Sequence, residues 1–279
     1  MRDKASVLIP FILLVSAETF SFFSDPSTTL SLHLLNIFVC VLLAIFIERY
    51  SDIFQAVMLI SLLRVLNIGM PTFFTYTLYS MPFMYGPTIL AGYILWRLTY
   101  NTIAKNAGGI RDFKAFLSVQ ARRTWEFINR GGMEQASKWN SLYVPAAIVI
   151  GLILANTEYI VLGRISLIPD ISLYNLTLLA VVMVVFVGFG EELIFRGFLQ
   201  ARIERHWGSG LAMLVSASTF AIMHSPYHSI PYMIYVFFVG LILASLFWKT
   251  RSLVFVALIH GILNFFLFSF LPNGWTIFT

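Results

Sequence analysis

The strongest constraint on this chain is a series of apolar runs that recurs along most of its length. A hydrocarbon core about 30 Å thick is crossed by a helix of about 20 apolar residues, and only helices and closed barrels satisfy their backbone groups in lipid. The runs therefore predict an all-α fold, a polytopic transmembrane helix bundle of about 8–9 spans. They cover Val7–Phe23, Leu30–Ile47, Ile53–Gly69, Leu78–Trp96, Leu142–Val161, Leu173–Phe189, Leu211–Met223, Tyr232–Trp248 and Leu253–Leu271.

The charge of the chain supports the same interpretation. Of its 279 residues 59% are hydrophobic and only 11% are charged, whereas an ordinary globular domain carries about 25% charged residues. The net charge of +5 comes from Lys and Arg that are spread over short connections, so we interpret it as a topology signal and expect no nucleic-acid partner. The expected surroundings are the lipid bilayer.

The distribution of basic residues predicts the orientation. With the N-terminus inside, nearly every Lys and Arg falls in an inner connection, and the outer connections hold only Arg164. The basic start and the apolar run Val7–Val15 resemble a signal peptide, but no small-residue cleavage pattern follows, so we expect an uncleaved first span. We predict an integral multi-pass protein of the cell membrane with a cytoplasmic N-terminus.

Three charged residues interrupt an otherwise apolar region at Glu191, Glu192 and Arg196. An ionisable side chain in a membrane span costs about 2.5 to 3.5 kcal/mol on insertion scales, so its presence points to a function. Glu192 and Arg196 are four residues apart, which favours an ion pair on one helix face, while Glu191 points about 100° away. The span is expected to continue to Arg205, with a break or kink near Gly188 and Gly190.

Two charges in the first half, Glu18 and Arg64, are expected to have a structural role. We predict that Arg64 snorkels or pairs with Glu18 or with Glu48. His33 is expected at the membrane interface. Cys40 is the only cysteine, which excludes an intrachain disulfide and a pair of catalytic thiols.

Further polar residues follow in the apolar runs of the second half: His224, and then His260 and Asn264 one helical turn apart. Counted from the basic ends of their runs, Glu191, His224 and Asn264 lie at depths of roughly 18 to 21 Å, at 1.5 Å per residue. If the helices are neighbours, a carboxylate, two imidazoles and a carboxamide converge. A desolvated carboxylate beside a histidine can activate water, and the remaining groups can donate hydrogen bonds to an oxyanion.

Other intramembrane protease chemistries lack their residues here. The sequence contains no HExxH zinc motif and no Gly-x-Ser-x-Gly nucleophile motif. All five aspartates fall outside the apolar runs or at their edges, so a pair of catalytic aspartates is not expected. A metal ion held by Glu191, His224 and His260 is chemically reasonable, but water activation by Glu and His does not require it, and we expect no metal and no cofactor.

The polar residues also carry a family resemblance. Glu191-Glu192-x-x-x-Arg196, Phe220-x-x-x-His224 and His260-x-x-x-Asn264 follow one another on consecutive apolar runs. This order resembles the CPBP family of intramembrane glutamic endopeptidases, which includes the type II CAAX prenyl proteases and the Abi proteins. The resemblance covers about Leu173 to Leu271.

The resemblance implies roles for these residues. Glu191 and His224 would activate the water, His260 and Asn264 would stabilise the oxyanion, and Glu192 and Arg196 would support the site. Phe220 is expected to support the site as a packing residue that shapes the pocket. The substrate would be a membrane-associated protein or peptide, such as a prenylated CAAX-type or C-terminally anchored one. A proton-coupled carrier and a non-catalytic scaffold or immunity protein on the same framework remain alternatives.

The chain is accordingly divided into three parts. Residues 1–100 are expected to form N-terminal transmembrane helices. Residues 101–140 are expected to form a basic amphipathic connection on the cytoplasmic side, held by anionic lipid and aromatic anchoring. Residues 141–279 are expected to form the catalytic transmembrane core.

Overall fold

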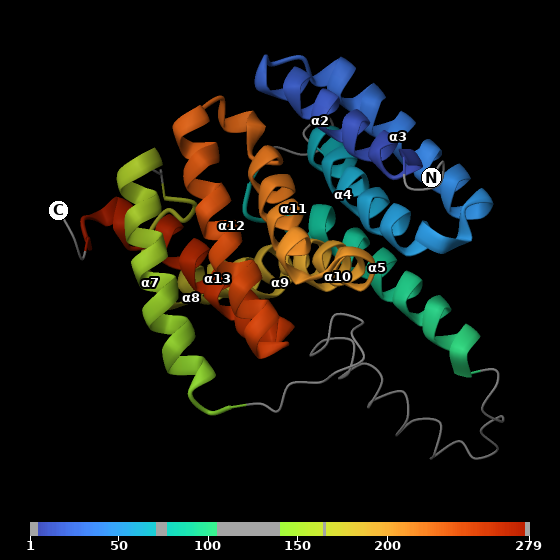
Figure 1. The fold of residues 1–279 in the computed structure, drawn as a ribbon. Coiled ribbons are helices and arrows are strands. Elements are labelled where there is room, and N and C mark those ends of the chain that lie inside the picture. The colour runs from blue at the N-terminus through green and yellow to red at the C-terminus, as the bar shows by residue number, and fades with distance from the viewer. Residues whose placement is uncertain (1–4, 71–76, 105–139, 164–165, 277–279) are drawn as a thin grey trace.

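The computed structural model describes residues 5–70, 77–104, 140–163 and 166–276, with the side chains of 98–104 left aside. The regular elements in these ranges are all helical, and the ranges contain no strand, which confirms the predicted all-α class (Figure 1). The helices are α2 (Leu8–Phe22), α3 (Pro26–Phe46), α4 (Ser51–Gly69), α5 (Met81–Ala104), α7 (Tyr143–Leu162), α8 (Leu173–Val181), α9 (Phe189–Glu192), α10 (Ala201–Trp207), α11 (Ser209–Ile222), α12 (Ile230–Thr250) and α13 (Leu253–Phe268). Two π-helical segments, η4 (Val182–Gly188) and η5 (Leu193–Gln200), and three 3-10 turns, η1 (Glu48–Tyr50), η6 (Ser225–Tyr227) and η7 (Leu271–Asn273), join them.

Six helices among the described residues are long and apolar enough to cross a membrane. Helix α2 is apolar as well but shorter. The chain is therefore an integral, multi-pass membrane protein. The predicted count of 8–9 spans is not reached in the described part of the chain, and most of the segment 101–140 lies outside it, so both remain predictions.

The helices are arranged around the long helical stretch from α8 to α10 (Figure 1). Helices α2, α3 and α4 lie together on one side of it, and α7, α12 and α13 lie on the other. The closest neighbours are α3 with α4, α7 with α13, and α11 with α12. The two halves of the chain meet where α4 and α5 pack against this stretch and where α2 packs against η6.

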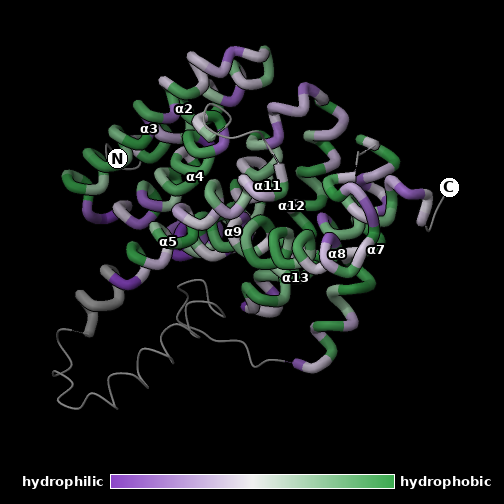
Figure 2. The backbone as a smooth tube through the Cα atoms, turned by 180° about the vertical axis from the view of Figure 1, so that it is seen from behind, coloured by the Kyte–Doolittle hydropathy of each residue, from purple (hydrophilic) through white to green (hydrophobic). Residues whose placement is uncertain are grey.

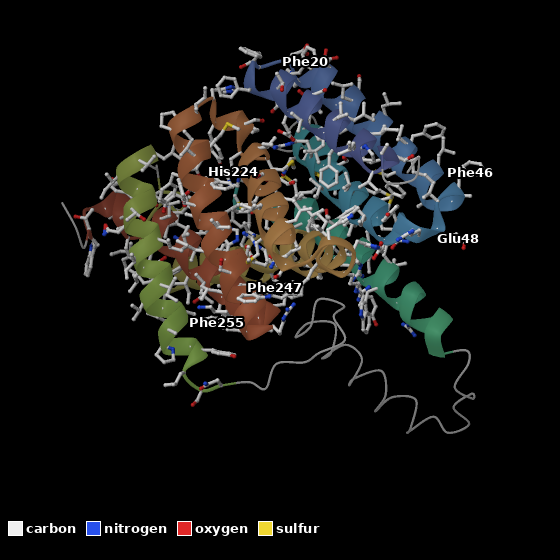
Figure 3. The ribbon with its side chains drawn as sticks, in the orientation of Figure 1. Phe20, Phe46, Glu48, His224, Phe247 and Phe255 are labelled. Carbon is white, nitrogen blue, oxygen red and sulfur yellow. The ribbon has the colours of Figure 1, made fainter. Side chains whose placement is uncertain are left out.

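The outer surface of the bundle is apolar. Figure 2 shows hydrophobic positions recurring along the labelled helices. Phe38 of α3 is 60% exposed and Phe238 of α12 is 56% exposed, and Figure 3 shows Phe20 and Phe46 on the outside of the N-terminal helices. Since a soluble protein rarely exposes a large continuous apolar surface, these side chains fit contact with lipid.

The predicted continuation of one span through the glutamates is confirmed. Residues Leu173–Trp207 form one helical stretch of 35 residues, and it contains π-helical turns on both sides of α9. Such wide turns often occur at functional sites and change the direction of the side chains that follow. They lie at the place where the sequence suggested a break.

Two glycines allow the stretch to approach α13 closely. A Cβ atom on Gly188 would lie 2.8 Å from the carbonyl oxygen of Ala257, and one on Gly261 would lie 2.6 Å from Cα of Val184. Both distances are too short for a real side chain, so the contact depends on glycine at both positions. This close packing brings His260 of α13 next to Glu191 and Glu192.

Polar caps fix the beginnings of three helices. Asp25 accepts a hydrogen bond from the backbone of Thr28 at the start of α3. Hydrogen bonds from the hydroxyl and the backbone of Thr28 hold the pKa of Asp25 below its ordinary value. Ser229 and Ser252 cap α12 and α13 in the same way. The three caps satisfy backbone donors that would otherwise lack a partner at a helix end.

Candidate active site

Four predicted residues from three parts of the chain line one small cavity of about 80 Å³. Glu191 comes from α9, His224 follows the end of α11, and His260 and Asn264 lie on α13. In Figure 3 the labelled His224 lies inside the bundle. The structure thus brings together the carboxylate, the two imidazoles and the carboxamide that the sequence singled out.

Glu192 does not face this cavity and is fully buried. Its Oε1 accepts a hydrogen bond from Arg196 at 2.8 Å, which is the predicted ion pair, and a second from Nδ1 of His260 at 2.8 Å. The second contact was not predicted. Glu192 therefore connects the long helical stretch to α13 and fixes the ring of His260.

Arg196 and Phe220 pack next to His224 and His260. Arg196 is fully buried and donates to the carbonyl of Gly240 at 2.9 Å, and its guanidinium lies 4.7 Å from the centre of the Phe220 ring. The same ring lies edge-on to His224 and to His260, with centroid distances of 4.9 and 5.7 Å. Phe220 thus packs against both imidazoles and limits their movement.

Within the described part of the chain, only one of the two carboxylate oxygens of Glu191 has a short hydrogen bond to a side chain. Its Oε1 accepts a hydrogen bond of 2.6 Å from the hydroxyl of Tyr85, and its Oε2 lies 3.7 Å from Nε2 of His260, which is longer than a hydrogen bond. The side chain is 13% exposed, in contrast to the fully buried Glu192. Gly190 makes room for the tyrosine, because a Cβ atom there would lie 3.0 Å from the Tyr85 ring.

The protonation of His224 follows from its contact with the backbone. Its Nδ1 lies 2.8 Å from the carbonyl oxygen of Phe220. A carbonyl only accepts, so Nδ1 carries the hydrogen, and in the neutral ring Nε2 is then a free acceptor. This is the tautomer that a residue needs to accept a hydrogen bond from water.

Two further residues of the cavity were missed in the sequence analysis. Tyr85 of α5 gave no signal, since it lies in an apolar run without a motif. Glu158 of α7, which accepts a 2.6 Å hydrogen bond from Tyr232, is a charge inside the run Leu142–Val161. The criterion that singled out Glu191 would have found Glu158 as well.

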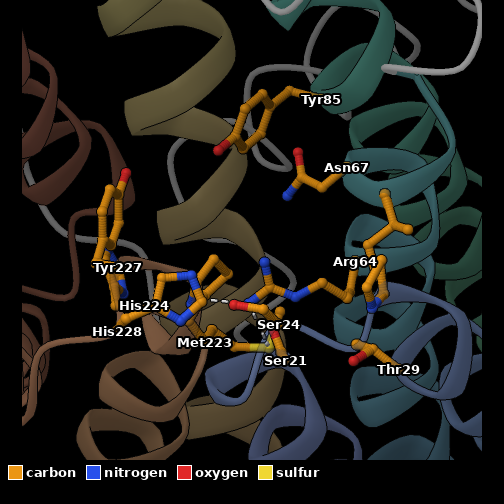
Figure 4. A pocket seen from close by; sticks show the side chains of 13 residues that line it. Ser21, Ser24, Thr29, Arg64, Asn67, Tyr85, Met223, His224, Tyr227 and His228 are labelled. Atoms are coloured by element: carbon orange, nitrogen blue, oxygen red, sulfur yellow. Dashed lines mark hydrogen bonds between the residues drawn. The ribbon is translucent and has the colours of Figure 1, made fainter.

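A second, wider cavity of about 610 Å³ adjoins the first (Figure 4). It shares Tyr85, His224 and Tyr227 with the smaller one. The other residues that line it are mostly polar, among them Arg64 and Asn67. Its volume lies in the range of about 300 to 1,000 Å³ that is typical of ligand pockets.

The acidic and histidine side chains around the cavity are not grouped as a metal site. Among the residues that the structure describes, no three His, Cys, Asp or Glu side chains are grouped so that they can hold one ion. This includes the set Glu191, His224 and His260 that the sequence suggested as an alternative. His260 is instead engaged with Glu192 through Nδ1.

Comparison with known protein families identifies a match in the second half of the chain. Residues 173–266 match the family described as type II CAAX prenyl endopeptidase Rce1-like. The chain contains an Rce1-like domain. This domain runs from the start of α8 into α13 and includes Glu191, His224, His260 and Asn264, so the resemblance noted from the sequence is confirmed and protease activity in general is implied. No curated protein and no solved structure matches the chain.

The Rce1-like domain leaves out part of the site. Tyr85 and Glu158 line the same cavity as the four polar residues but precede the matched segment. Helices α5 and α7 thus contribute residues to the cavity from outside the matched segment.

Proposed function

We propose that the protein is an intramembrane endopeptidase of the glutamic type, in which Glu191 and His224 activate a water molecule for attack on a peptide bond. The observation that carries the proposal is the convergence of Glu191, His224, His260 and Asn264 on one cavity. Glu191 retains an oxygen without a short contact to a cation, as a general base requires.

The first step is the attack of water on the carbonyl carbon of the substrate. One hydrogen of the water is accepted by Glu191, and the other is held by the free Nε2 of His224. As the oxygen forms a bond to carbon, Glu191 takes the proton. When the tetrahedral intermediate collapses, the C–N bond breaks and Glu191 returns this proton to the leaving amine.

The second requirement is stabilisation of the oxyanion. The carboxamide of Asn264 donates one hydrogen bond and His260 donates another from Nε2. His260 already donates from Nδ1 to Glu192, so a ring that donates from both nitrogens is an imidazolium, and the two glutamates on either side supply its countercharge. Arg196 and Phe220 hold this arrangement in place.

The substrate proposed here is a membrane-associated protein or peptide. The family match supports a prenylated CAAX-type or C-terminally anchored sequence, and the 610 Å³ cavity beside Tyr85 and His224 is wide enough for a short peptide segment. We place the protein in the cell membrane with a cytoplasmic N-terminus, residues 1–100 as its N-terminal helices and residues 141–279 as its catalytic core.

Peptide cleavage by the purified protein tests this function. The wild type and a His224→Ala variant are incubated with a prenylated peptide that ends in a CAAX sequence and with a panel of membrane-anchored peptides. We expect the wild type to cleave at least one peptide and His224→Ala to cleave it about 10² to 10⁴ times more slowly. Absence of cleavage of every peptide by the wild type, or full activity of the variant, contradicts the proposal. Proton-coupled uptake into liposomes without proteolysis would favour the carrier instead.

A further inference from the structure

The chain around His224 is held by helices that lie outside the Rce1-like domain. Arg64 of α4 donates a hydrogen bond to the carbonyl oxygen of Met223, the residue before His224. Ser225, the residue after it, donates to Oε2 of Glu18 on α2 at 2.6 Å. Figure 4 shows Arg64 reaching across the cavity to Met223, beside His224. Both neighbours of the histidine are thus tied to the N-terminal helices.

These contacts originate in one buried ion pair, Glu18 and Arg64, which has His33, Asn36 and Ser61 as polar neighbours. Arg64 binds both oxygens of Glu18, from Nε at 2.8 Å and from Nη2 at 2.9 Å. His33 lies 3.0 Å from Glu18, and Asn36 donates to Ser61 at 3.0 Å. At most 5% of each of these residues is exposed. Three helices therefore hold the carboxylate and the guanidinium in fixed positions.

The local structure of His224 makes these contacts important. Helix α11 ends at Ile222, and His224 precedes the short 3-10 turn η6. The turn is followed by His228, which has a left-handed backbone conformation with φ of 52°. A residue just beyond a helix end has fewer backbone restraints than one inside it, so the direction of the His224 ring depends on what holds Met223 and Ser225.

We propose that Glu18 and Arg64 are positioning residues for His224, which fix the turn Met223–Ser225 so that the imidazole faces the reaction cavity. This inference rests on the proposed function of His224. A buried ion pair contributes little net stability compared with apolar residues of similar volume. Its effect here is geometric: it connects the N-terminal helices to the residue that contacts the water.

Two serine variants separate positioning from stability. Ser225→Ala removes the contact between Glu18 and the turn but leaves the Glu18–Arg64 pair intact. Ser61→Ala removes a buried hydroxyl that contacts His33 and Asn36 rather than Glu18, Arg64 or the turn. Both serines are buried, so the two variants are matched in chemistry and in burial.

On a peptide that the wild type cleaves, we expect Ser225→Ala to lower kcat by about 10-fold to 10²-fold with little change in KM, since small displacements of a catalytic group have effects of this size. Ser61→Ala should lower the thermal stability but leave kcat within about 2-fold. Arg64→Lys, which keeps the charge but loses the planar fork, should lower kcat like Ser225→Ala if it folds.

A readout that does not depend on activity completes the test. In protein labelled with ¹⁵N-histidine, the ring nitrogens of the five histidines are observed by NMR, and the His224 signals are assigned with a His224→Asn variant. We expect Ser225→Ala to shift or broaden the His224 signals and Ser61→Ala to leave them unchanged. Identical His224 signals in the wild type and both variants overturn the positioning role, even if no peptide is cleaved. A changed His224 signal without any cleavage leaves the positioning intact and refutes the proposed function instead.

Discussion

Two carboxylates inside the helix bundle, Glu18 and Glu191, differ in how their oxygens are used. Each has a histidine close by and lies in an apolar helix. Glu18 accepts from Arg64, His33 and Ser225 within 3.0 Å, so both of its oxygens are occupied. Glu191 has one short contact, from Tyr85, and its second oxygen is left toward the cavity.

The difference separates a carboxylate that holds structure from one that is available for chemistry. A fully hydrogen-bonded carboxylate has no lone pair left for a water molecule and is expensive to disturb. A carboxylate with an open oxygen on a cavity can accept a proton. Charge inside a membrane is thus not sufficient to indicate catalysis, and the number of occupied lone pairs is the better criterion.

The largest effect is expected from Glu18→Gln. The change leaves the buried guanidinium of Arg64 without its countercharge, and breaking such a pair costs about 3 to 5 kcal/mol. Thermal denaturation in detergent should show a strongly lowered Tm. The control is Glu48→Gln, because Glu48 is exposed and should change stability by no more than about 0.5 kcal/mol. Equal Tm values for the two variants would contradict the structural role of Glu18.

A pair of asparagine variants sharpens the comparison. Asn264→Ala removes a proposed oxyanion donor and should lower kcat by about 10² to 10³-fold with the fold retained. Asn36→Ala removes a buried carboxamide from the polar neighbours of the Glu18–Arg64 pair and should lower Tm instead, with kcat of the folded protein nearly unchanged. Rates of peptide cleavage and melting curves are measured for both. A kcat loss as large in Asn36→Ala as in Asn264→Ala contradicts the division between the two regions.

The smallest effect is expected from Tyr85→Phe. It removes one hydrogen bond to the Glu191 carboxylate, and hydrogen bonds to charged groups contribute about 1.5 to 3 kcal/mol, so kcat should fall by about tenfold or somewhat more. Tyr232→Phe is the matched control, since Tyr232 binds Glu158 in the same cavity at the same 2.6 Å distance. A larger loss in Tyr232→Phe would transfer the role of base to Glu158.

The sequence predicted the elements that follow from simple physical rules. Apolar runs of sufficient length predicted an all-helical membrane protein, and the cost of a buried charge predicted the pair of Arg196 with Glu192. For Arg64 the sequence left snorkelling, Glu18 and Glu48 open, and the structure selects Glu18. The helical continuation beyond Glu192 was also anticipated. Each of these depends on local pattern or on charge balance, which a single sequence contains.

Other features depend on tertiary contacts that no local pattern encodes. His33 was predicted at the membrane interface, and this was wrong, because it is fully buried against Glu18 and Ser61. Tyr85 reaches Glu191 across 106 positions of the chain, and nothing near it in the sequence indicates this contact. The π-helical turns around α9 were likewise unpredicted in kind, although a break was expected at that place.

The most direct test of the account is the cleavage rate of Glu191→Gln, measured in a single turnover below the Tm of the variant. Glutamine keeps the size of the side chain and the acceptor for Tyr85 but cannot take a proton from water. The account predicts a rate about 10² to 10⁴ times lower for Glu191→Gln, with a melting curve close to that of the wild type. A Glu191→Gln protein that cleaves at the wild-type rate would contradict it.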